Sequence, residues 1–417
     1  MAGIQISSEL KLPLDLNSKA FANNKYAYYQ WMRENSPVFY GKLSILNAYV
    51  FSRYEDCVML LKDPRFVRDR STITGGNKFP VPSFIPLPTS AKLAIQSMIT
   101  EDDPDHKRLR GLVHQAFTRK SLTKVSARIE QLTYTLLNKA GAKSRAEGSV
   151  DLKSEYALPI PVIVIQEMMG VSEADMPRFR EGVRAMATGL SGWAIARTLF
   201  WDLPQLSKFV RELIVRKRSH PGDDILTGLI QAEEDGHQLS EDEIVSMVFL
   251  IIVAGYETTV QLITNGVLTL LQHPQQLAKL RANPDLIGSA VEEMLRFAGP
   301  VHSTKPMYAT EEILLHDVTI PRGATVWPCL GAANRDPAVF DRPEVFDIER
   351  SPNKHLGFGG GIHACLGAPL ARIEAKIAIA NLLQRSPSLR LAVDPSDLKV
   401  QVRPGWHTYK SLPVILS

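Results

Sequence analysis

Hydrophobic residues recur every three to four positions along most of the chain, which is the spacing of an amphipathic helix. This spacing predicts helices over residues 25–35, 121–144, 154–170, 172–187 and 203–218. Alternation typical of strands is confined to short stretches, at 37–43, 47–51, 300–309 and in a C-terminal hairpin at 402–414. From Asp63 to about Thr100 the periodic pattern stops, and prolines mix with apolar residues in F-P-V-P-S-F-I-P-L-P. A loop of this length inside a compact protein is usually functional or disordered, and its apolar composition argues against disorder.

Two capping boxes mark predicted helix starts. Ser52, with Glu55 three residues later, predicts a helix that runs through Leu61. Ser240, with Glu243 three residues later, opens the longest helical pattern, which continues to about Gln272. At 1.5 Å per residue this helix is roughly 48 Å long, enough to cross a whole domain.

The middle of that longest helix reads A-G-Y-E-T-T, at 254–259, and contains residues that are unfavourable inside a buried helix. A glycine such as Gly255 costs about 1 kcal/mol relative to alanine inside a helix. A carboxylate such as Glu257 is costlier still if the helix is buried. Unfavourable residues inside an otherwise strongly predicted helix are expected at functional sites.

A glycine-rich loop, G-F-G-G-G-I-H-A-C-L-G at 357–367, leads into a helix that tolerates Pro369 in its first turn. Cys365 lies just before that helix, where unpaired N–H groups and the helix dipole favour the thiolate, the form that ligates metal. A lone cysteine is otherwise more often a small buried hydrophobe. The stretch Gly359-x-Gly361-x-x-Ala364 also fits a dinucleotide fingerprint, but the polar, turn-like segment before it is no buried strand.

The loop matches the haem-binding signature F-G-x-G-x-[HR]-x-C-x-G of the cytochrome P-450 family at every fixed position. A-G-Y-E-T-T likewise resembles the family's oxygen-activating segment, [AG]-G-x-[DE]-T-[TS]. The resemblance spans nearly the whole chain. It implies one domain over residues 1–417 with the mainly α fold of the family and a small β-rich subdomain.

The same resemblance implies the roles of the site residues. Cys365 is expected to ligate the iron of haem b, and Glu257 and Thr258 to deliver protons during oxygen activation. His106, Arg110 and His363 are expected to bind the haem propionates. The remaining expected haem contacts are Phe358, Gly359, Ala254 and Gly367. Expected substrate contacts are Phe84, Ile85, Val253, Val301, His302 and Thr408.

Glu293 and Arg296 match the family's E-x-x-R pair, which implies a structural role and not a chemical one. Arg350 is the candidate for the third member, because Val345 occupies the arginine position of the eukaryotic P-E-R-F pattern. The chain departs from the family at Met307, where relatives usually carry an arginine for a haem propionate. Lys305, two residues away and on the same strand face, is a candidate replacement.

The amino-acid composition limits the class of protein and its compartment. Hydrophobic residues make up 45% of the 417 residues and charged residues 22%, as in ordinary soluble globular proteins. A net charge of +4 is too small to indicate nucleic-acid binding, and three cysteines at no metal-ligand spacing favour a reducing compartment. The N-terminal sequence lacks the apolar core of a signal peptide or anchor. We therefore expect a cytoplasmic monomer without a membrane anchor.

The resemblance to the cytochrome P-450 family implies a haem-thiolate monooxygenase that inserts one oxygen atom from O2 into a hydrophobic small molecule, by hydroxylation or epoxidation of a polyketide or macrolide, a terpenoid or a steroid. The sequence shows no flavin or iron–sulfur module, so electrons are expected from a ferredoxin or flavodoxin with its NAD(P)H-dependent reductase. Two alternatives stay open: a fatty-acid hydroxylase or peroxygenase, and a non-catalytic haem protein that senses or carries gas. The resemblance is greatest to bacterial enzymes that modify polyketides and macrolides.

Overall fold

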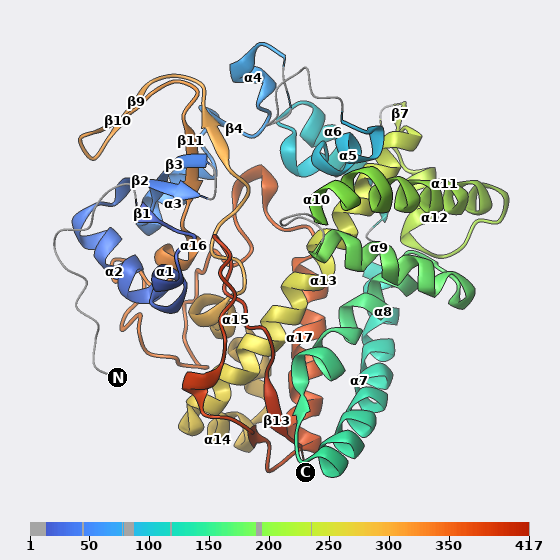
Figure 1. The fold of residues 1–417 in the computed structure, drawn as a ribbon, viewed down its shortest axis with the longest axis vertical. Helices are drawn as coiled ribbons and strands as arrows, with labels where there is room; N and C mark the ends of the chain where they lie inside the picture. The colour runs from blue at the N-terminus through green and yellow to red at the C-terminus, as the bar shows by residue number, and fades with distance from the viewer. Residues whose placement is uncertain are drawn as a thin grey trace. The chain divides into compact units, whose positions relative to one another are not determined.

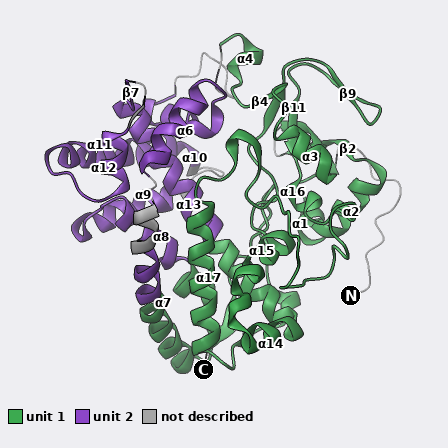
Figure 2. Ribbon diagram, turned by 180° about the vertical axis from the view of Figure 1, so that it is seen from behind, with its two compact units in different colours: residues 1–76, 133–157, 260–417 green, residues 77–132, 158–259 purple. Residues whose placement is uncertain are grey.

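The computed structural model describes residues 14–43, 46–76, 78, 87–116, 119–188, 194–234 and 236–416 (Figure 1). Contacts group the chain into two compact units (Figure 2). Unit 1 comprises Met1–Gly76, Thr133–Ala157 and Val260–Ser417, and unit 2 comprises Asn77–Leu132 and Leu158–Thr259. The division falls within two helices, α7 (Arg119–Glu147) and α13 (Glu241–Gln272). That residues 1–417 form one domain stays a prediction.

Unit 2 is mainly helical. Besides parts of α7 and α13, its helices are α5 (Thr89–Ile95), α6 (Asp105–Ala116), α8 (Pro159–Met168), α9 (Met176–Thr188), α10 (Ala194–Arg197), α11 (Leu203–Ser219) and α12 (Ile225–Gln231). Short 3₁₀ turns lie at Met98–Thr100 and Glu173–Asp175, and a π-turn, η4, lies at Thr198–Asp202. Its strands are the two-residue pair β6 (Glu233–Glu234) and β7 (His237–Gln238).

Unit 1 combines helices with small sheets. Its helices are α1 (Lys19–Asn23), α2 (Lys25–Asn35), α3 (Tyr54–Leu60), α4 (Ser71–Thr74), α14 (Pro274–Ala282), α15 (Ile287–Ala298), α16 (Leu330–Ala333) and α17 (Ala368–Arg385). Short helical turns lie at Lys153–Ala157, Pro284–Leu286, Gly361–His363 and Pro395–Asp397. Helices α15 and α17 pack side by side (Figures 1 and 2).

The largest sheet of unit 1 has the order β1-β2-β3-β11-β8-β4. Its strands are β1 (Leu14–Asp15), β2 (Val38–Leu43), β3 (Leu46–Phe51), β11 (Thr325–Pro328), β8 (Met307–Ala309) and β4 (Phe66–Val67). A hairpin pairs β9 (Ile313–Leu315) with β10 (Val318–Ile320), and a third sheet joins β12 (Arg390–Leu391), β13 (Pro413–Ile415) and β5 (Val150–Asp151).

Side-chain alternation explains the large sheet. Val38 and Phe51 pair across β2 and β3 and are both buried, whereas Lys42 is exposed. The apolar face joins a core cluster that also includes Cys57 of α3, which is fully buried. The fold is therefore mainly helical with small sheets, in agreement with the sequence prediction.

One predicted capping box is confirmed and the other is wrong. Ser240 and Glu243 bond reciprocally: the Ser240 amide donates to the Glu243 carboxylate at 2.8 Å, and the Glu243 amide donates to Ser240 Oγ at 3.2 Å. Ser52 does not cap α3, because its hydroxyl donates instead to the Pro37 carbonyl at 3.1 Å, and Arg53 occupies the N-cap position. The predicted strand at 300–309 is also shorter than expected, since only Met307–Ala309 enters a sheet.

Helix α13 is the one helix of the described residues that is long and apolar enough to cross a membrane by length and composition. Of its most apolar window, 56% is buried inside the protein. The core helix of a soluble protein meets the same criterion, so this feature is weak evidence for a span.

Candidate active site

The cysteine loop of unit 1 holds Cys365 at its end, three residues before α17 begins. The amide of Cys365 donates to the Phe358 carbonyl at 3.0 Å, which closes the loop. Cys365 is exposed and forms no disulfide, whereas Cys57 and Cys329 are both buried. An exposed thiol on a tied loop before a helix N-terminus is well placed to act as a ligand.

Two glycines of this loop need backbone conformations that other residues rarely adopt. Gly359 has φ of 69° and Gly361 has φ of 65°. A Cβ atom on Gly361 would also lie 1.9 Å from the carbonyl oxygen of Leu61, in the turn after α3. The loop therefore depends on glycine for its path and for its close approach to the neighbouring backbone.

An acidic residue of α15 braces the same loop. Glu292 accepts hydrogen bonds from Arg372 at 2.7 and 2.8 Å and lies 3.0 Å from Nε2 of His355. Burial alone would raise the pKa of Glu292, but the bonds with Arg372 and His355 outweigh it and lower this pKa to about 2. The Arg372 guanidinium lies 4.5 Å from the centre of the Phe358 ring, so the ion pair is coupled to the loop. The sequence did not predict this arrangement, since the E-x-x-R pattern singles out Glu293 and no motif includes Glu292.

Glu293, the next residue of α15, lies at the centre of a buried network. Arg296 donates two bonds to it, both of 2.7 Å, and neither side chain is exposed. Arg350 donates to the same carboxylate at 3.2 Å, as does Asn353 at 3.1 Å. The three residues expected to form a structural triad therefore meet, with Asn353 as a fourth member that no sequence signal indicated.

In unit 2, the A-G-Y-E-T-T segment lies within the unbroken helix α13. Thr258 donates its hydroxyl hydrogen bond to the Ala254 carbonyl at 2.7 Å. Close packing explains the glycine at position 255, because a Cβ there would lie 2.8 Å from Cδ1 of Ile165 in α8. Val253 and Ala254 are exposed, although most of α13 is apolar and buried, and Glu257 is half-buried.

The two residues expected to contact the propionates in unit 2 lie one turn apart on α6. His106 is buried, with Nδ1 3.4 Å from the Asp103 carboxylate, and Arg110 is half-buried. In unit 1, His363 is half-buried at the end of the loop's 3₁₀ turn. Lys305 is exposed, and Met307, the first residue of β8, is buried in the core.

The expected substrate contacts differ in their exposure. Val253 is exposed and Val301 is half-buried. His302 is buried and pairs with the Tyr29 hydroxyl at 2.9 Å, and Thr408 is fully buried and donates to Gln401 at 3.1 Å. Neither of these two buried side chains is open to a ligand in this structure. Phe84 and Ile85 lie outside the described residues.

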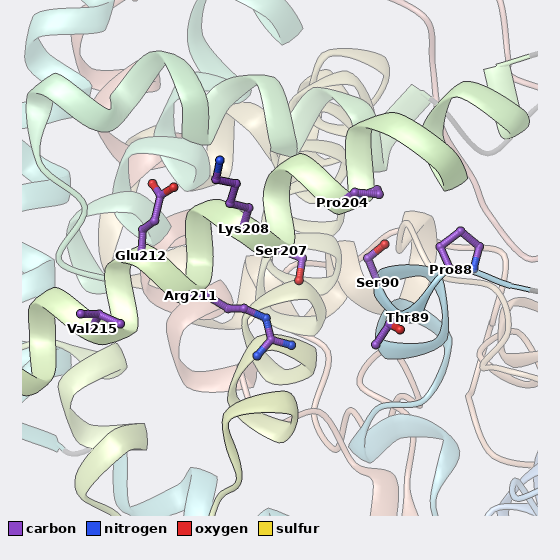
Figure 3. A pocket seen from close by; sticks show the side chains of 9 residues that line it. All are labelled: Pro88, Thr89, Ser90, Pro204, Ser207, Lys208, Arg211, Glu212 and Val215. Atoms are coloured by element: carbon purple, nitrogen blue, oxygen red, sulfur yellow. The ribbon is translucent and has the colours of Figure 1, made fainter.

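Unit 2 also has a pocket of about 620 Å³ between α5 and α11, which holds none of the predicted haem or substrate residues. Figure 3 shows its lining, which is formed by Pro88, Thr89, Ser90, Pro204, Ser207, Lys208, Arg211, Glu212 and Val215.

The residues fit a haem. The loop offers one exposed thiol beside glycines that leave room for a flat ligand. Taken by itself, unit 2 offers His106 and Arg110, side chains of the kind that bind carboxylates, and exposes the apolar residues Val253 and Ala254. Cysteine thiolate is a known axial ligand of haem iron.

Comparison with known proteins identifies the family. Residues 207–396 match the family model "Cytochrome P450". The chain is 41% identical to cytochrome P450 107B1 of Saccharopolyspora erythraea, over 95% of this chain and 96% of that protein. It is 38% identical to the polyketide biosynthesis cytochrome P450 PksS of Bacillus subtilis, over 98% and 99% of the two chains.

Solved structures agree. The structure of PksS matches with a TM-score of 0.88 and 37% identity, covering 96% of this chain and 99% of that chain. P450BioI, solved in complex with an acyl carrier protein that carries hexadec-9Z-enoic acid, matches with a TM-score of 0.85 and 37% identity, over 95% and 99% of the two chains. The fold predicted from the sequence is thereby confirmed. The chain belongs to the cytochrome P450 family and is a haem-thiolate monooxygenase.

Proposed function

We propose that the protein hydroxylates or epoxidises a hydrophobic small molecule of the polyketide or macrolide class, or a terpenoid or steroid of similar size. The observation that carries this proposal is the similarity to PksS, a polyketide biosynthesis enzyme, along nearly the whole of both chains. The apolar residues exposed on α13 support a hydrophobic ligand.

In this proposal the cofactor is haem b, and Cys365 ligates its iron. When bound, a haem with a thiolate ligand activates O2 and supplies the oxygen atom that enters the substrate. The bracing of the loop by Arg372 and Glu292 holds the thiol in place, and the positive charge of Arg372 favours the thiolate. His106, Arg110 and His363 bind the propionates.

Proton control is assigned to Glu257 and Thr258. The Thr258 hydroxyl, which now bonds to the Ala254 carbonyl, also has lone pairs that can accept a bond from a water molecule. Glu257 is half-buried, so its carboxylate can exchange protons with solvent and pass them towards the site.

Electrons are proposed to come from a ferredoxin or flavodoxin with its NAD(P)H-dependent reductase. A second candidate substrate class is a fatty acyl group, because the similar P450BioI was solved with an acyl chain on a carrier protein. A fatty-acid hydroxylase or peroxygenase would fit the same cysteine loop.

The test is a spectral titration of the purified ferric protein with macrolides, steroids, terpenes, free fatty acids and acyl carrier proteins loaded with fatty acids. A saturable low-to-high-spin shift marks a ligand that displaces water from the iron. Shifts with macrocyclic or polycyclic compounds would support the proposal. Shifts only with fatty acids, free or carrier-bound, would transfer the assignment to the second class.

A further inference from the structure

A buried asparagine lies in the part of α13 that belongs to unit 1. Asn265 is only 2% exposed, and Ile263 and Val267 on either side of it are buried and apolar. Asparagine forms helices less readily than leucine, and its amide loses water when it is buried. The carbonyl oxygen of this amide, Oδ1, is buried and accepts no hydrogen bond within the described residues. A leucine would avoid these costs, so the two N–H donors must explain the asparagine.

Both hydrogens of that amide are used, and they join two segments that are far apart in the sequence. Nδ2 of Asn265 donates to the Ala298 carbonyl at 3.0 Å and to the His407 carbonyl at 2.8 Å. Ala298 is the last residue of α15, where backbone carbonyls have no partner inside their own helix. Because both acceptors are carbonyl oxygens, the orientation of the amide is fixed.

The two segments that Asn265 holds, 298–302 and 405–408, run beside each other and are hereafter called the paired segments. Two backbone hydrogen bonds of 2.8 Å each join them, from the His407 amide to Pro300 and from the His302 amide to Gly405. Each segment therefore fixes the backbone of the other, and Asn265 holds both of them through one side chain.

Asn265 is also the link between the paired segments and α13. Among the residues that the structure describes, no other hydrogen bond joins positions 260–272 of α13 to either segment. The next residue, Gly266, lets α15 approach closely, because a Cβ there would lie 2.6 Å from Sδ of Met294. Lys25 of α2 donates to the Trp406 carbonyl and provides a second anchor for the turn, but not one to α13.

The paired segments carry three of the residues expected to contact the substrate. Of these, His302 and Thr408 are buried, and Val301 is half-buried. Val301 also forms an antiparallel bridge with Trp406, so the place of its side chain depends on the pairing of the segments. The helix to which Asn265 ties them, α13, is the one that carries Thr258.

We propose that Asn265 is a positioning residue for the substrate. By holding the paired segments against α13, it sets the place at which Val301 meets a hydrophobic molecule, before that molecule binds. Contacts that are fixed in advance need no ordering when the ligand arrives, and this raises the affinity for a ligand that packs on them. The inference rests on the proposed function, because it takes the paired segments to be substrate contacts.

The test uses the full-length protein loaded with haem. Asn265→Leu removes both donors at similar size. Asn265→Thr is the second variant should the leucine variant fail to fold, since its hydroxyl is expected to bond one turn back, as those of Thr264 and Thr269 do. Tyr156→Phe is the matched control: its buried hydroxyl donates to the Ala378 carbonyl at 2.7 Å, in α17 and not in the paired segments.

Two readouts are compared. The first is hydrogen exchange at the amides of His302 and His407, which pair the segments. The second is the spectral Kd of two iron ligands: imidazole, which is small, and clotrimazole, whose three aryl rings reach the walls of the pocket. Imidazole reports only on access to the iron, so the ratio of the two Kd values isolates the contribution of the walls.

Asn265→Leu should speed exchange at both amides about tenfold or more, because two buried hydrogen bonds are lost. It should also weaken clotrimazole binding about tenfold, since the released segments must be ordered again around a bulky ligand. The Kd of imidazole should not change. Tyr156→Phe should leave both Kd values and both exchange rates unaltered, even where it lowers Tm.

If Asn265→Leu speeds exchange but leaves the Kd of clotrimazole unchanged, Asn265 only supports the fold, and the inference is wrong. Unchanged exchange, or equal weakening of both azoles, would also overturn it. A wrong substrate class gives a different pattern. In that case the unaltered protein shows no spin shift with macrolides, terpenes or steroids, while the azole and exchange results for Asn265→Leu stay as expected, because they need no substrate.

Discussion

A methyl group on Gly361 would lie 1.9 Å from the carbonyl oxygen of Leu61, which ties the cysteine loop to the turn after α3. Gly361→Ala would also force alanine to adopt φ of 65°. We expect this variant to lose about 1–3 kcal/mol or more of local stability, and with it the thiolate spectrum, because both the strain and the clash act on the loop. The measurement is the carbon-monoxide difference spectrum together with a thermal melt.

The control for this prediction lies in the same loop. Gly360 has φ of −169°, which any residue adopts, and a Cβ there would lie 3.4 Å from Cδ1 of Leu61, an ordinary van der Waals contact. Gly360→Ala should therefore retain the thiolate spectrum. Equal damage from both substitutions would show that the loop tolerates no added methyl group, whatever its contacts.

Breaking the buried pair of Glu293 and Arg296 should strongly destabilise unit 1. Both side chains are completely buried, and Glu293 also accepts from Arg350 and Asn353. Glu293→Gln would leave an uncompensated buried guanidinium, at a cost of about 3–5 kcal/mol. Urea unfolding measures this loss. The exposed pair Lys279–Glu349 is the control, since Glu349→Gln should cost no more than about 1 kcal/mol.

The sequence alone predicted much of this arrangement because its strongest signals are local. Helical periodicity placed α2 and α11 to within a residue, and the Ser240–Glu243 box marked the start of α13 because both partners lie within one turn. The same logic failed at Ser52, whose hydroxyl found a partner 15 residues away, at Pro37. The sequence pattern of a capping box shows that the cap can form, and tertiary contacts decide whether it does form.

The site residues likewise divide into those in contiguous motifs and those with partners far apart in the chain. Cys365 and Thr258 were predicted because their motifs are contiguous in the chain. The bracing of the loop by Glu292 and Arg372 joins residues 80 positions apart, so no spacing rule reveals it.

Thr258→Ala should leave haem binding intact and divert electrons from product to hydrogen peroxide. Its hydroxyl bonds only within α13, to Ala254 one turn earlier, so its removal leaves the helix in place. We expect the ratio of product formed to NAD(P)H consumed to fall about tenfold, because proton delivery by a positioned group contributes at least this much. Thr258→Ser should retain most of the coupling.

A second threonine of α13 provides the structural control for that experiment. Thr264 donates to the Val260 carbonyl at 2.7 Å, the same kind of bond at the same spacing. Thr264→Ala should reduce stability without raising peroxide production. If Thr258→Ala remains fully coupled, or if Thr264→Ala uncouples to the same degree, the assigned role of Thr258 is wrong.

Two buried histidines of unit 1 should make the protein sensitive to mild acid. The rings of His302 and His407 stack with centres 5.3 Å apart and planes at 11°. Burial first, and then the charges of Lys25 and Arg335, lower the pKa of His407 to about 3. Burial, and then His407 and the same cations, hold the pKa of His302 well below its usual value.

The sign follows from proton uptake. Below about pH 6.5 the unfolded chain protonates these histidines while the folded protein keeps them neutral, so stability falls as the pH drops from about 6.5 towards 3. Each histidine contributes a slope of at most about 1.4 kcal/mol per pH unit. Urea unfolding at several pH values in this range measures the slope.

His407→Phe keeps a ring in the stack and removes one titrating group. It should therefore reduce the slope of stability against pH by up to the contribution of one histidine. The exposed His220, changed to Gln, should leave the slope unaltered. An unchanged slope in His407→Phe would mean that other groups, such as Glu292 with its pKa of about 2, account for the acid sensitivity.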